Sequence, residues 1–399
     1  MTKSTIDLEN TYCAQNYAPL PVVLSKGEGI FVWDEQGNKY LDMMSAYSAV
    51  SHGHCHPRLV KVLQQQASRL GVVSRAYYSD QLGAFLQKAC EMTGFEKALP
   101  MNTGAEAVET ALKAARKWAY TVKGVAENQA EIISCENNFH GRTIAIVGMS
   151  SEAQYQHGFG PFPAGLKQIP FANAAALERA INKNTAAFIV EPIQGEGGIV
   201  IPPAGYLKEC QAICQKHNVL LLCDEVQTGL GRTGRFLAYE HDGVKPDGLI
   251  LGKALGGGLL PVSMFLANEA VMSVFTPGDH GSTFGGYPLA AAVGLEALNI
   301  LDEEKLWEHS KTLGEYFLDQ LQAIQHAAIK EVRGKGLFVG MEFYPKAVSA
   351  RVFCEKLMAQ GILSKDTHHT VARFAPPLII EKPDIDWAVA QIKSVLANV

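Results

Sequence analysis

Short apolar runs alternate with amphipathic, helix-like patterns along most of this chain. The runs contain few polar residues, which is typical of strands that are buried on both faces. We expect strands at Lys97–Met101, Glu131–Cys135, Ala187–Val190, Val219–Cys223 and Gly248–Leu251, and helices at Ala105–Val122 and Tyr206–His217. Repeated alternation of strand and helix predicts an α/β fold with a mostly parallel central sheet.

The two ends of the chain follow a different pattern. Ile30–Trp33 and Lys39–Leu41 flank a polar turn, which predicts a β-hairpin. Beyond Glu303 we expect a helix, a strand, a second helix, a second strand and a last helix, which together predict a smaller α+β domain. The inner three of these elements are expected at Gly336–Phe343, Val348–Gln360 and Val371–Ala375. The division we expect is an N-terminal segment that packs with the small domain, a large domain and the small domain, over 1–44, 45–299 and 300–399.

Composition and charge exclude several classes of protein. The chain has 399 residues, of which 47% are hydrophobic, and its net charge of −5 gives no basic surface for nucleic acid. No apolar stretch is long enough to span a bilayer, and Met1–Glu9 lacks the apolar core of a signal peptide. The eight cysteines form no C-x-x-C pair, and we expect reduced thiols without a catalytic role. These features predict a cytoplasmic protein with no membrane or nucleic-acid partner.

Two charged residues stand at the ends of apolar runs. Lys253 follows Gly248–Gly252, and Asp224 follows Val219–Cys223. A parallel sheet brings such strand ends together at the edge where ligands bind. Pyridoxal phosphate needs both groups, because a lysine holds it as a Schiff base and an acidic residue faces its pyridinium nitrogen. We therefore take Lys253 and Asp224 as candidate catalytic residues.

A candidate phosphate site lies at the start of the helix expected after Lys97–Met101. Thr103 and Glu106 have the spacing of a capping box, which marks a helix start. The amide groups of Gly104 and Ala105 would then point at an anion, assisted by the helix dipole. The alternative is a well-capped helix without a ligand. The nearby strand ends with their lysine and aspartate favour phosphate.

Three loops or strands contain further candidates. Phe139 could stack on a flat heterocycle, and Arg142 offers a planar fork for a carboxylate. Glu196 lies in a glycine-rich loop after a strand, where functional residues are common. Arg373 lies within an apolar strand, where an arginine is usually paired or binds an anion. The alternatives are a core phenylalanine, a surface arginine and a solvated glutamate.

Two motifs suggest chemistry that we reject. Gly229–Gly234 matches the dinucleotide fingerprint, but five residues separate it from the strand end, and Arg235–His241 is too short for the required helix. The histidines of His52–His56 could suggest a metal site, but a polar turn leading into a helix at Pro57 is the better interpretation. We expect no metal.

A long segment of the chain resembles a known signature. Leu222–Gly234, followed by Asp247 and Lys253, is similar to the signature of the class III aminotransferases, which are pyridoxal-phosphate enzymes of the aspartate-aminotransferase-like fold, fold type I. The similarity covers almost the whole chain. It is greatest to the branch that acts on ornithine, on the segments Asn16–Pro21, Tyr47–Val50, Arg116–Trp118, Val190–Glu196, His280–Thr283 and Arg373–Pro377. His140 departs from that branch, which often has tryptophan there, and agrees with the wider family.

The resemblance implies a role for each cofactor-binding candidate. Lys253 would hold the cofactor and carry the proton, and Asp224 would keep the ring nitrogen protonated. Gln227 would bond the ring hydroxyl, and Phe139 would cover the ring face. The phosphate would be held by Gly104, Ala105 and, from the partner subunit, Thr283. The last contact implies a homodimer with shared active sites, or a larger assembly built from it.

The resemblance also implies the reaction and its substrate-binding residues. The δ-amino group of L-ornithine would pass to 2-oxoglutarate, giving glutamate 5-semialdehyde and glutamate. Arg142 would bind the α-carboxylate of ornithine, Tyr17 its α-amino group, and Tyr47 would line the pocket. Glu196 would pair with Arg373 and mask it until 2-oxoglutarate binds.

Other activities remain open. N-acetylornithine, 4-aminobutyrate or a diamine could replace ornithine, although the pair Tyr17 and Tyr47 suits a free α-amino group better than an acetylated one. A mutase or decarboxylase on the same scaffold would not need 2-oxoglutarate. A nucleotide-dependent oxidoreductase would depend on the glycine fingerprint rejected above.

Overall fold

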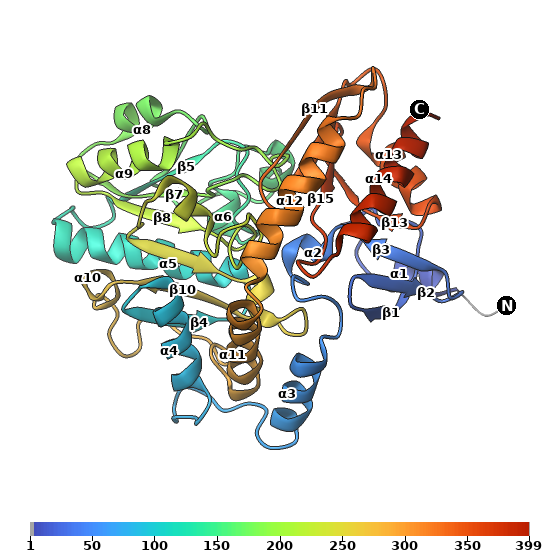
Figure 1. Cartoon of the computed structure of the whole chain (residues 1–399). Helices are drawn as coiled ribbons and strands as arrows, with labels where there is room; N and C mark the ends of the chain where they lie inside the picture. Colours follow the sequence, from blue (N-terminus) through green and yellow to red (C-terminus); the bar gives the residue numbers. More distant parts are fainter. Residues whose placement is uncertain (1–3, 399) are drawn as a thin grey trace.

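The computed structural model describes residues 4–398, and its centre is a seven-stranded sheet (Figure 1). The strand order across this sheet is β4 (Lys97–Met101), β10 (Ser263–Ala267), β9 (Gly248–Leu251), β8 (Leu220–Asp224), β7 (Thr185–Val190), β5 (Glu131–Cys135) and β6 (Leu166–Ile169). The five strands from β9 to β6 run parallel, while β10 is antiparallel to both β4 and β9.

Helices cover both faces of this sheet, with α8 and α9 on one side and α5 and α10 on the other (Figure 1). Successive side chains of a strand therefore enter different apolar clusters. Ile132 and Leu222 pack in the cluster with α5, whereas Ile133 and Cys223 pack in the cluster with α9. Burial on both faces explains why these strands have almost no polar residues.

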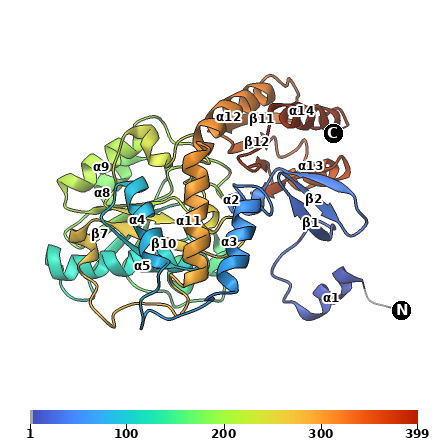
Figure 2. The same cartoon turned by 60° about the horizontal axis from the view of Figure 1, so that its bottom comes forward.

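The helices of this part and its flanks have the following bounds: α2 (Ser45–Ser48), α3 (Pro57–Ala67), α4 (Leu82–Thr93), α5 (Gly104–Trp118), α6 (Ile144–Val147), α7 (Ala153–Gln156), α8 (Ala174–Ala180), α9 (Tyr206–Lys216), α10 (Glu269–Met272) and α11 (Pro288–Glu303). A π-helical turn, η1 (Ala119–Lys123), extends α5, and two short 3₁₀ helices are η2 (Ala238–Asp242) and η3 (Lys253–Gly256). In Figures 1 and 2, α3 lies beside α11, where Arg58 donates a hydrogen bond to Glu296 at 2.7 Å.

Two smaller sheets form the rest of the molecule. One contains β1 (Leu24–Glu28), β2 (Phe31–Asp34), β3 (Lys39–Asp42) and β13 (Ile362–Leu363); the other contains β11 (Ile329–Gly334), β12 (Val339–Phe343), β15 (Val371–Phe374) and β14 (Lys365–Thr367). Because β3 pairs with β13, an N-terminal and a C-terminal segment of the chain lie side by side (Figure 1). The remaining helices are α1 (Thr5–Tyr12), α12 (Leu306–Gln322), α13 (Ala350–Ala359) and α14 (Lys382–Leu396).

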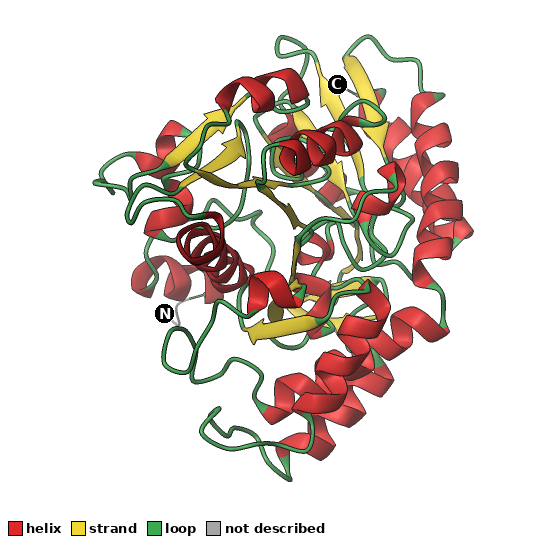
Figure 3. Cartoon of the chain, turned by 90° about the vertical axis from the view of Figure 1, so that its left-hand side faces the viewer, coloured by secondary structure: helices red, strands yellow, loops and turns green. Residues whose placement is uncertain are grey.

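Helices and strands occupy different regions of the molecule. Figure 3 shows long helices along the right-hand and lower sides, with strands at the centre and toward the top. Figure 2 shows α1 apart from the body of the molecule, and none of its residues is buried. None of the helices in residues 4–398 combines the length and the apolar character needed to cross a bilayer.

Most elements lie where the hydrophobic pattern predicts them. β4, β5 and β9 have the expected bounds, and the expected hairpin is β2 with β3. α5 begins one residue before the predicted Ala105, directly after its capping residue Thr103. The pattern missed six strands, and β12 begins at Val339 rather than Gly336. The missed strands are β1, β6, β10, β11, β13 and β14.

The predicted boundary between the large and the small domain remains a prediction, and it can be compared with the helix bounds. The division between 299 and 300 falls inside α11, which continues to Glu303 before α12 begins at Leu306. We propose a large domain that ends at the α11–α12 connection. The shared sheet of β3 and β13 supports an N-terminal segment that packs with the small domain, with the large domain beginning near Ser45, where α2 starts.

The rejected glycine fingerprint has a structural use. Gly229–Gly234 forms consecutive turns, and Arg232 within it is completely buried. The Arg232 guanidinium donates to the backbone oxygens of Leu337 at 2.9 Å and Pro376 at 2.5 Å. Burial lowers the pKa of Arg232 to about 9. The loop after β8 is thereby attached to the chain next to β12 and β15, and β15 contains Arg373.

The histidine run also has local partners. A ring nitrogen of His52 lies 3.0 Å from the backbone oxygen of Ala297, and His54 pairs with Asp42 at 2.7 Å. α3 begins directly after His56, as the proline at the next position predicts.

Candidate active site

Lys253 follows β9 after one residue, Gly252, and is the first residue of η3. Its φ of +48° lies in the left-handed region, which is costly for a lysine and is typical of functional sites. Within residues 4–398, no group hydrogen-bonds or ion-pairs with its Nζ. Burial lowers the pKa of Lys253, while the carboxylates of Glu196 and Asp224 act in the opposite direction. The structure therefore holds a desolvated amine, which is the form that reacts as a nucleophile.

Asp224 ends β8 and faces a histidine. His140 Nδ1 donates to Asp224 Oδ2 at 2.6 Å, and the amide of Val226 donates to Oδ1 at 3.0 Å. Both side chains are buried. Burial alone would lower the pKa of His140, but the hydrogen bond and charge of Asp224 outweigh it and raise this pKa. His140 belongs to the same loop motif as Phe139 and Arg142, but no sequence pattern indicates its contact with Asp224.

The capping box of α5 is present as expected. Thr103 Oγ1 accepts from the amide of Glu106 at 3.2 Å, and Glu106 Oε2 accepts from the amide of Thr103 at 2.7 Å. In the described part of the chain, the amides of Gly104 and Ala105 have no acceptor. A Cβ on Gly104 would lie 2.9 Å from Val226 Cγ1, so only glycine keeps this helix end open. Two free amides at a helix start form an anion site.

These groups meet in one cavity of about 160 Å³. Its lining includes six of the predicted residues, namely Gly104, Ala105, Phe139, Asp224, Gln227 and Lys253. A neighbouring cavity of about 380 Å³ also reaches Lys253 and Gly104. The donor set fits pyridoxal phosphate: a free amine, an aromatic ring, free amides at a helix start, and a carboxylate backed by a buried histidine whose Nε2 has no partner among the described residues.

Gln227 lies against the glycine-rich loop after β7. The side chain is buried, and a Cβ on Gly195 would lie 1.9 Å from Gln227 Oε1. A larger residue at position 195 would therefore have to displace the Gln227 amide.

Glu191 is a buried carboxyl directly after β7, and it is not among the predicted site residues. Its oxygens accept from the amide of Phe139 at 3.0 Å and from the amide of Gly195 at 3.4 Å. Burial raises the pKa of Glu191 to about 7, although the nearby charge of His140 acts against this. Glu191 thus joins the loop that contains Phe139 to the loop that contains Glu196.

Glu191 should make stability depend on pH. A carboxyl whose pKa is about 7 in the fold and 4.5 when unfolded binds its proton more tightly in the fold. Its burial therefore costs stability as pH rises from about 4.5 to about 7, by on the order of 3 kcal/mol, and the cost is constant above that range. Glu191→Gln should flatten this part of the profile, measured as the change in melting temperature between pH 5 and pH 8. Profiles of equal slope in the variant and the parent would contradict it.

Glu196 and Arg373 form the expected ion pair. Arg373 Nη1 donates to Glu196 Oε1 at 2.6 Å, and only 5% of the Arg373 surface is exposed. Burial alone would raise the pKa of Glu196, but the charge and hydrogen bond of Arg373, together with the charges of Lys253 and His368, lower this pKa overall. The Arg373 guanidinium also lies 5.2 Å from the centre of the Tyr47 ring. The pair is therefore charged at neutral pH and lies beside Tyr47.

Arg142 is held differently. Its guanidinium lies 5.4 Å from the Phe139 ring centre and 3.6 Å from that of Tyr155. In residues 4–398 its side chain makes no hydrogen bond or ion pair. Arg142 is thus an available cation near the wall of the cofactor cavity, since Phe139 lines that cavity.

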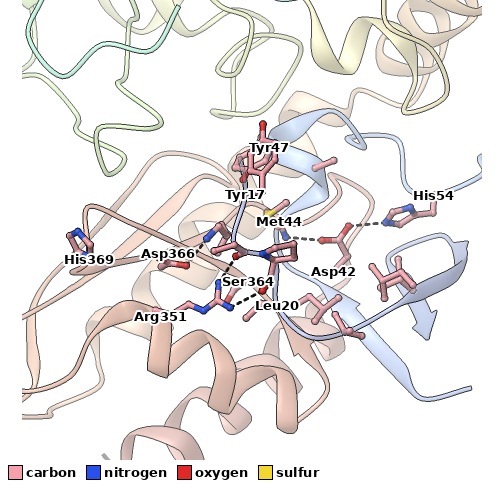
Figure 4. A pocket seen from close by; sticks show the side chains of 18 residues that line it. Tyr17, Leu20, Asp42, Met44, Tyr47, His54, Arg351, Ser364, Asp366 and His369 are labelled. Atoms are coloured by element: carbon pink, nitrogen blue, oxygen red, sulfur yellow. Dashed lines mark hydrogen bonds and ion pairs between the residues drawn. The ribbon is translucent and has the colours of Figure 1, made fainter. Parts of the chain in front are cut away.

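Tyr17 and Tyr47 lie together at one end of a larger cavity of about 720 Å³, shown in Figure 4. The N-terminal segment forms one wall. Arg351 holds it by donating to the backbone oxygens of Ala18 at 2.8 Å and Pro19 at 2.9 Å. Tyr47 lies within electrostatic range of Glu196, Arg373 and Tyr17, and burial is the main cause that raises its pKa.

Thr283 is the one predicted cofactor-binding residue that does not line the Lys253 cavities in the described chain. It is exposed, in the loop between α10 and α11. The preceding Ser282 accepts a hydrogen bond from Asn102 at 2.9 Å. Within one chain, therefore, Thr283 is separate from the site.

Comparison with known proteins agrees with this geometry. A family model described as class-III aminotransferase matches residues 12–396. The chain is 57% identical over 401 residues to an ornithine aminotransferase of Geobacillus sp., with all of both chains covered. It is 56% identical over 397 residues to an ornithine aminotransferase of Bacillus subtilis, with 100% and 98% covered.

Solved structures show the same fold. An ornithine aminotransferase from Toxoplasma gondii, with partial occupancy of PLP at its active site, superposes with a TM-score of 0.97 at 46% identity, covering 99% of this chain and 93% of that one. An acetylornithine aminotransferase from Elizabethkingia anophelis gives 0.90 at 47% identity, covering 99% and 98%. The fold is that of the fold type I pyridoxal-phosphate transferases, an α/β fold with a mostly parallel central sheet. This chain belongs to the class-III aminotransferase family.

Proposed function

We propose that this enzyme transfers the δ-amino group of L-ornithine to 2-oxoglutarate, giving glutamate 5-semialdehyde, which cyclises to a pyrroline carboxylate, and glutamate. The observation that carries this proposal is the ion pair of Glu196 with Arg373, beside an Arg142 that has no acidic partner in residues 4–398. Ornithine has one carboxylate and 2-oxoglutarate has two. One available arginine is enough for ornithine, and a second arginine that can be unmasked is needed for 2-oxoglutarate. A site with one available and one masked arginine therefore suits both substrates. The curated relatives named ornithine aminotransferase support the same substrate.

Pyridoxal phosphate is the cofactor, and it supplies a ring that withdraws electrons from the substrate carbon bearing the nitrogen. Lys253 is the residue that would hold it and move the proton at that carbon. Asp224, supported by His140, would keep the ring nitrogen protonated. Gln227 would bond the ring hydroxyl, and the amides of Gly104 and Ala105 would hold the phosphate.

Ornithine would bind with its δ-amine at Lys253 and its other end away from it. Arg142 would take the α-carboxylate, and Tyr17 would take the α-amino group, with Tyr47 lining the pocket between them. Glu196 keeps Arg373 neutralised, so an α-carboxylate gains little by binding there. The reversed pose, which would place the α-amine at the reaction centre, is thereby disfavoured.

Binding of 2-oxoglutarate would require the ion pair of Glu196 with Arg373 to open. Glu196 would turn away, and Arg373 would bind the α-carboxylate while Arg142 binds the distal one. The exchange is balanced in charge, because a substrate carboxylate replaces the Glu196 carboxylate against a buried guanidinium. An unpaired buried arginine would be costly, so the switch follows substrate binding.

A homodimer with shared sites is part of this proposal. Thr283 is exposed and separate from the Lys253 cavities, which suits a residue that reaches the phosphate of a partner subunit. Tyr77, Tyr78 and Phe284 are large exposed side chains with 72%, 103% and 49% exposure, and such apolar surface is typical of interfaces. Sedimentation of the purified enzyme should give a dimer or a multiple of it, and a stable, active monomer would contradict the assignment of Thr283.

A reducing compartment such as the cytoplasm is also proposed. All eight cysteines are free thiols in the structure, and five of them are buried. Free thiols are typical of proteins in reducing compartments.

The function is tested by a panel of amino donors with 2-oxoglutarate. Ornithine should give the highest kcat/KM, with the semialdehyde trapped by an aromatic amine. N-acetylornithine belongs in the panel because the Elizabethkingia anophelis structure is an acetylornithine enzyme. 4-Aminobutyrate and a diamine complete it. A higher kcat/KM with N-acetylornithine than with ornithine, or turnover without 2-oxoglutarate, would contradict the proposal.

A further inference from the structure

Tyr155 contacts Arg142 in a way that the sequence does not reveal. The guanidinium carbon of Arg142 lies 3.6 Å from the centre of the Tyr155 ring, which is a close cation–π contact. The Phe139 ring meets the Tyr155 ring edge-on, with centres 6.2 Å apart and planes at 84°. The three side chains form one group, in which Phe139 lines the cofactor cavity and Arg142 lies above both rings.

The two substrate-binding arginines are held by different means. Arg373 is held by the carboxylate of Glu196, which neutralises it. Arg142 is held by aromatic faces, and no acidic group of residues 4–398 pairs with it. An aromatic face orients a guanidinium but leaves its N–H donors free for a ligand. A carboxylate ligand of Arg142 therefore displaces no protein group.

The segment that contains Tyr155 is fixed against the loop that contains Phe139 and Arg142. The side chain of Gln156 donates to the backbone oxygens of Val147 at 3.1 Å and Ser150 at 2.6 Å. Ser151 Oγ accepts from the amide of Asn137 at 2.7 Å. These bonds close the chain on itself between β5 and β6, so the Tyr155 ring has a fixed place under the guanidinium.

Tyr155 also lies within reach of the other arginine site. Its pKa is raised mainly by burial, and the charges of Arg142, Glu196 and Arg373 all act on it. The ring is therefore neutral at physiological pH and lies in electrostatic range of both proposed carboxylate sites.

We propose that Tyr155 is a positioning residue that holds the Arg142 guanidinium in place for the substrate carboxylate without neutralising it. This inference rests on the proposed function, in which Arg142 binds the α-carboxylate of ornithine and the distal carboxylate of 2-oxoglutarate. The tyrosine acts through Arg142 and does not touch the reacting atoms.

Tyr155→Leu should raise KM for both ornithine and 2-oxoglutarate by about two- to fivefold, the scale of a cation–π contact with an exposed arginine, while kcat stays close to the parental value. Tyr155→Phe and Tyr155→Trp keep an aromatic face and should stay near the parent. An alkylamine donor without a carboxylate should be unaffected by any of them. Tyr344→Leu, at an exposed tyrosine of the small domain, is the matched control. Tyr155→Met is a second non-aromatic variant if Tyr155→Leu fails to fold.

A double-mutant cycle with Arg142→Ala separates the possible results. If Tyr155 acts through Arg142, then Tyr155→Leu adds nothing to KM once Arg142→Ala is present. Additive effects of the two substitutions on KM would overturn the role of Tyr155 but not that of Arg142. An unchanged KM in Tyr155→Leu, together with a raised KM in Arg142→Ala, would have the same meaning. An unchanged KM in Arg142→Ala would instead overturn the proposed carboxylate site and, with it, this inference. Binding of glutarate, followed by the cofactor absorbance, gives the same comparison without turnover.

Discussion

Lys253→Ala should lower turnover of ornithine with 2-oxoglutarate by about 10⁴-fold or more, because general acid–base catalysis by a positioned group alone contributes about 10²–10⁴-fold. Lys253 is the one amine in the cofactor cavity among the described residues, and nothing there holds its Nζ. Burial lowers its pKa, which favours the neutral form of the amine that reacts as a nucleophile. The first measurement is kcat at saturating cofactor. The second is the protein mass after borohydride treatment, and this mass should include the cofactor in the parent but not in the variant.

Two observations would separate a catalytic loss from a folding loss. An added small primary amine should restore part of the activity of Lys253→Ala, since it can take over proton transfer in the space left by the side chain. Lys208→Ala, on the exposed face of α9, should behave as the parent. If Lys253→Ala keeps more than about a hundredth of the parental turnover, the assignment of Lys253 is wrong.

Glu196→Ala should shift donor preference toward α-amino acids, raising the ratio of kcat/KM for glutamate over ornithine by about 100-fold. Losing one member of a buried ion pair leaves the other charge unpaired, at a cost of about 2–5 kcal/mol that an incoming carboxylate relieves. In the variant, Arg373 would offer that site to the α-carboxylate of any donor. The measurement is the pair of kcat/KM values, each from the half-reaction with a single donor.

The controls for this prediction are also in the chain. Glu331 pairs with Arg333 at 2.7 Å on the surface, and Glu331→Ala should leave the donor ratio unchanged. Glu196→Gln keeps the shape without the charge and should resemble Glu196→Ala. In the parent, the lowered pKa of Glu196 means that its charge is lost only below its usual titration range, so the ratio should be constant from pH 6 to pH 8. An unchanged ratio in both Glu196 variants would remove the masking role.

Features encoded locally were predictable from the sequence. The apolar runs before Asp224 and Lys253 are strands because burial on both faces requires such runs, and the two residues meet because parallel strands end at one edge. The capping box at Thr103 was readable because it is a contact across three residues.

Features that depend on tertiary packing were not predictable. β10 is a short buried strand after a glycine-rich stretch, and nothing in its five residues indicates that it runs antiparallel between β4 and β9. Tyr155 meets Arg142 only because Gln156 and Ser151 fold the chain back on itself. Glu191 has a conspicuous position after a strand, but its role as a link between two loops depends on backbone amides that no sequence pattern marks.

The central claim is that the amine distant from the carboxylate of ornithine is the one transferred. Ornithine labelled with ¹⁵N at the δ position, incubated with the enzyme and 2-oxoglutarate, tests it directly by mass spectrometry of the glutamate formed. We expect the δ-label in glutamate and an unlabelled α-nitrogen retained in the pyrroline product. Unlabelled glutamate, with the label left in the product from ornithine, would show α-transfer and would contradict the assigned roles of Arg142, Glu196 and Arg373.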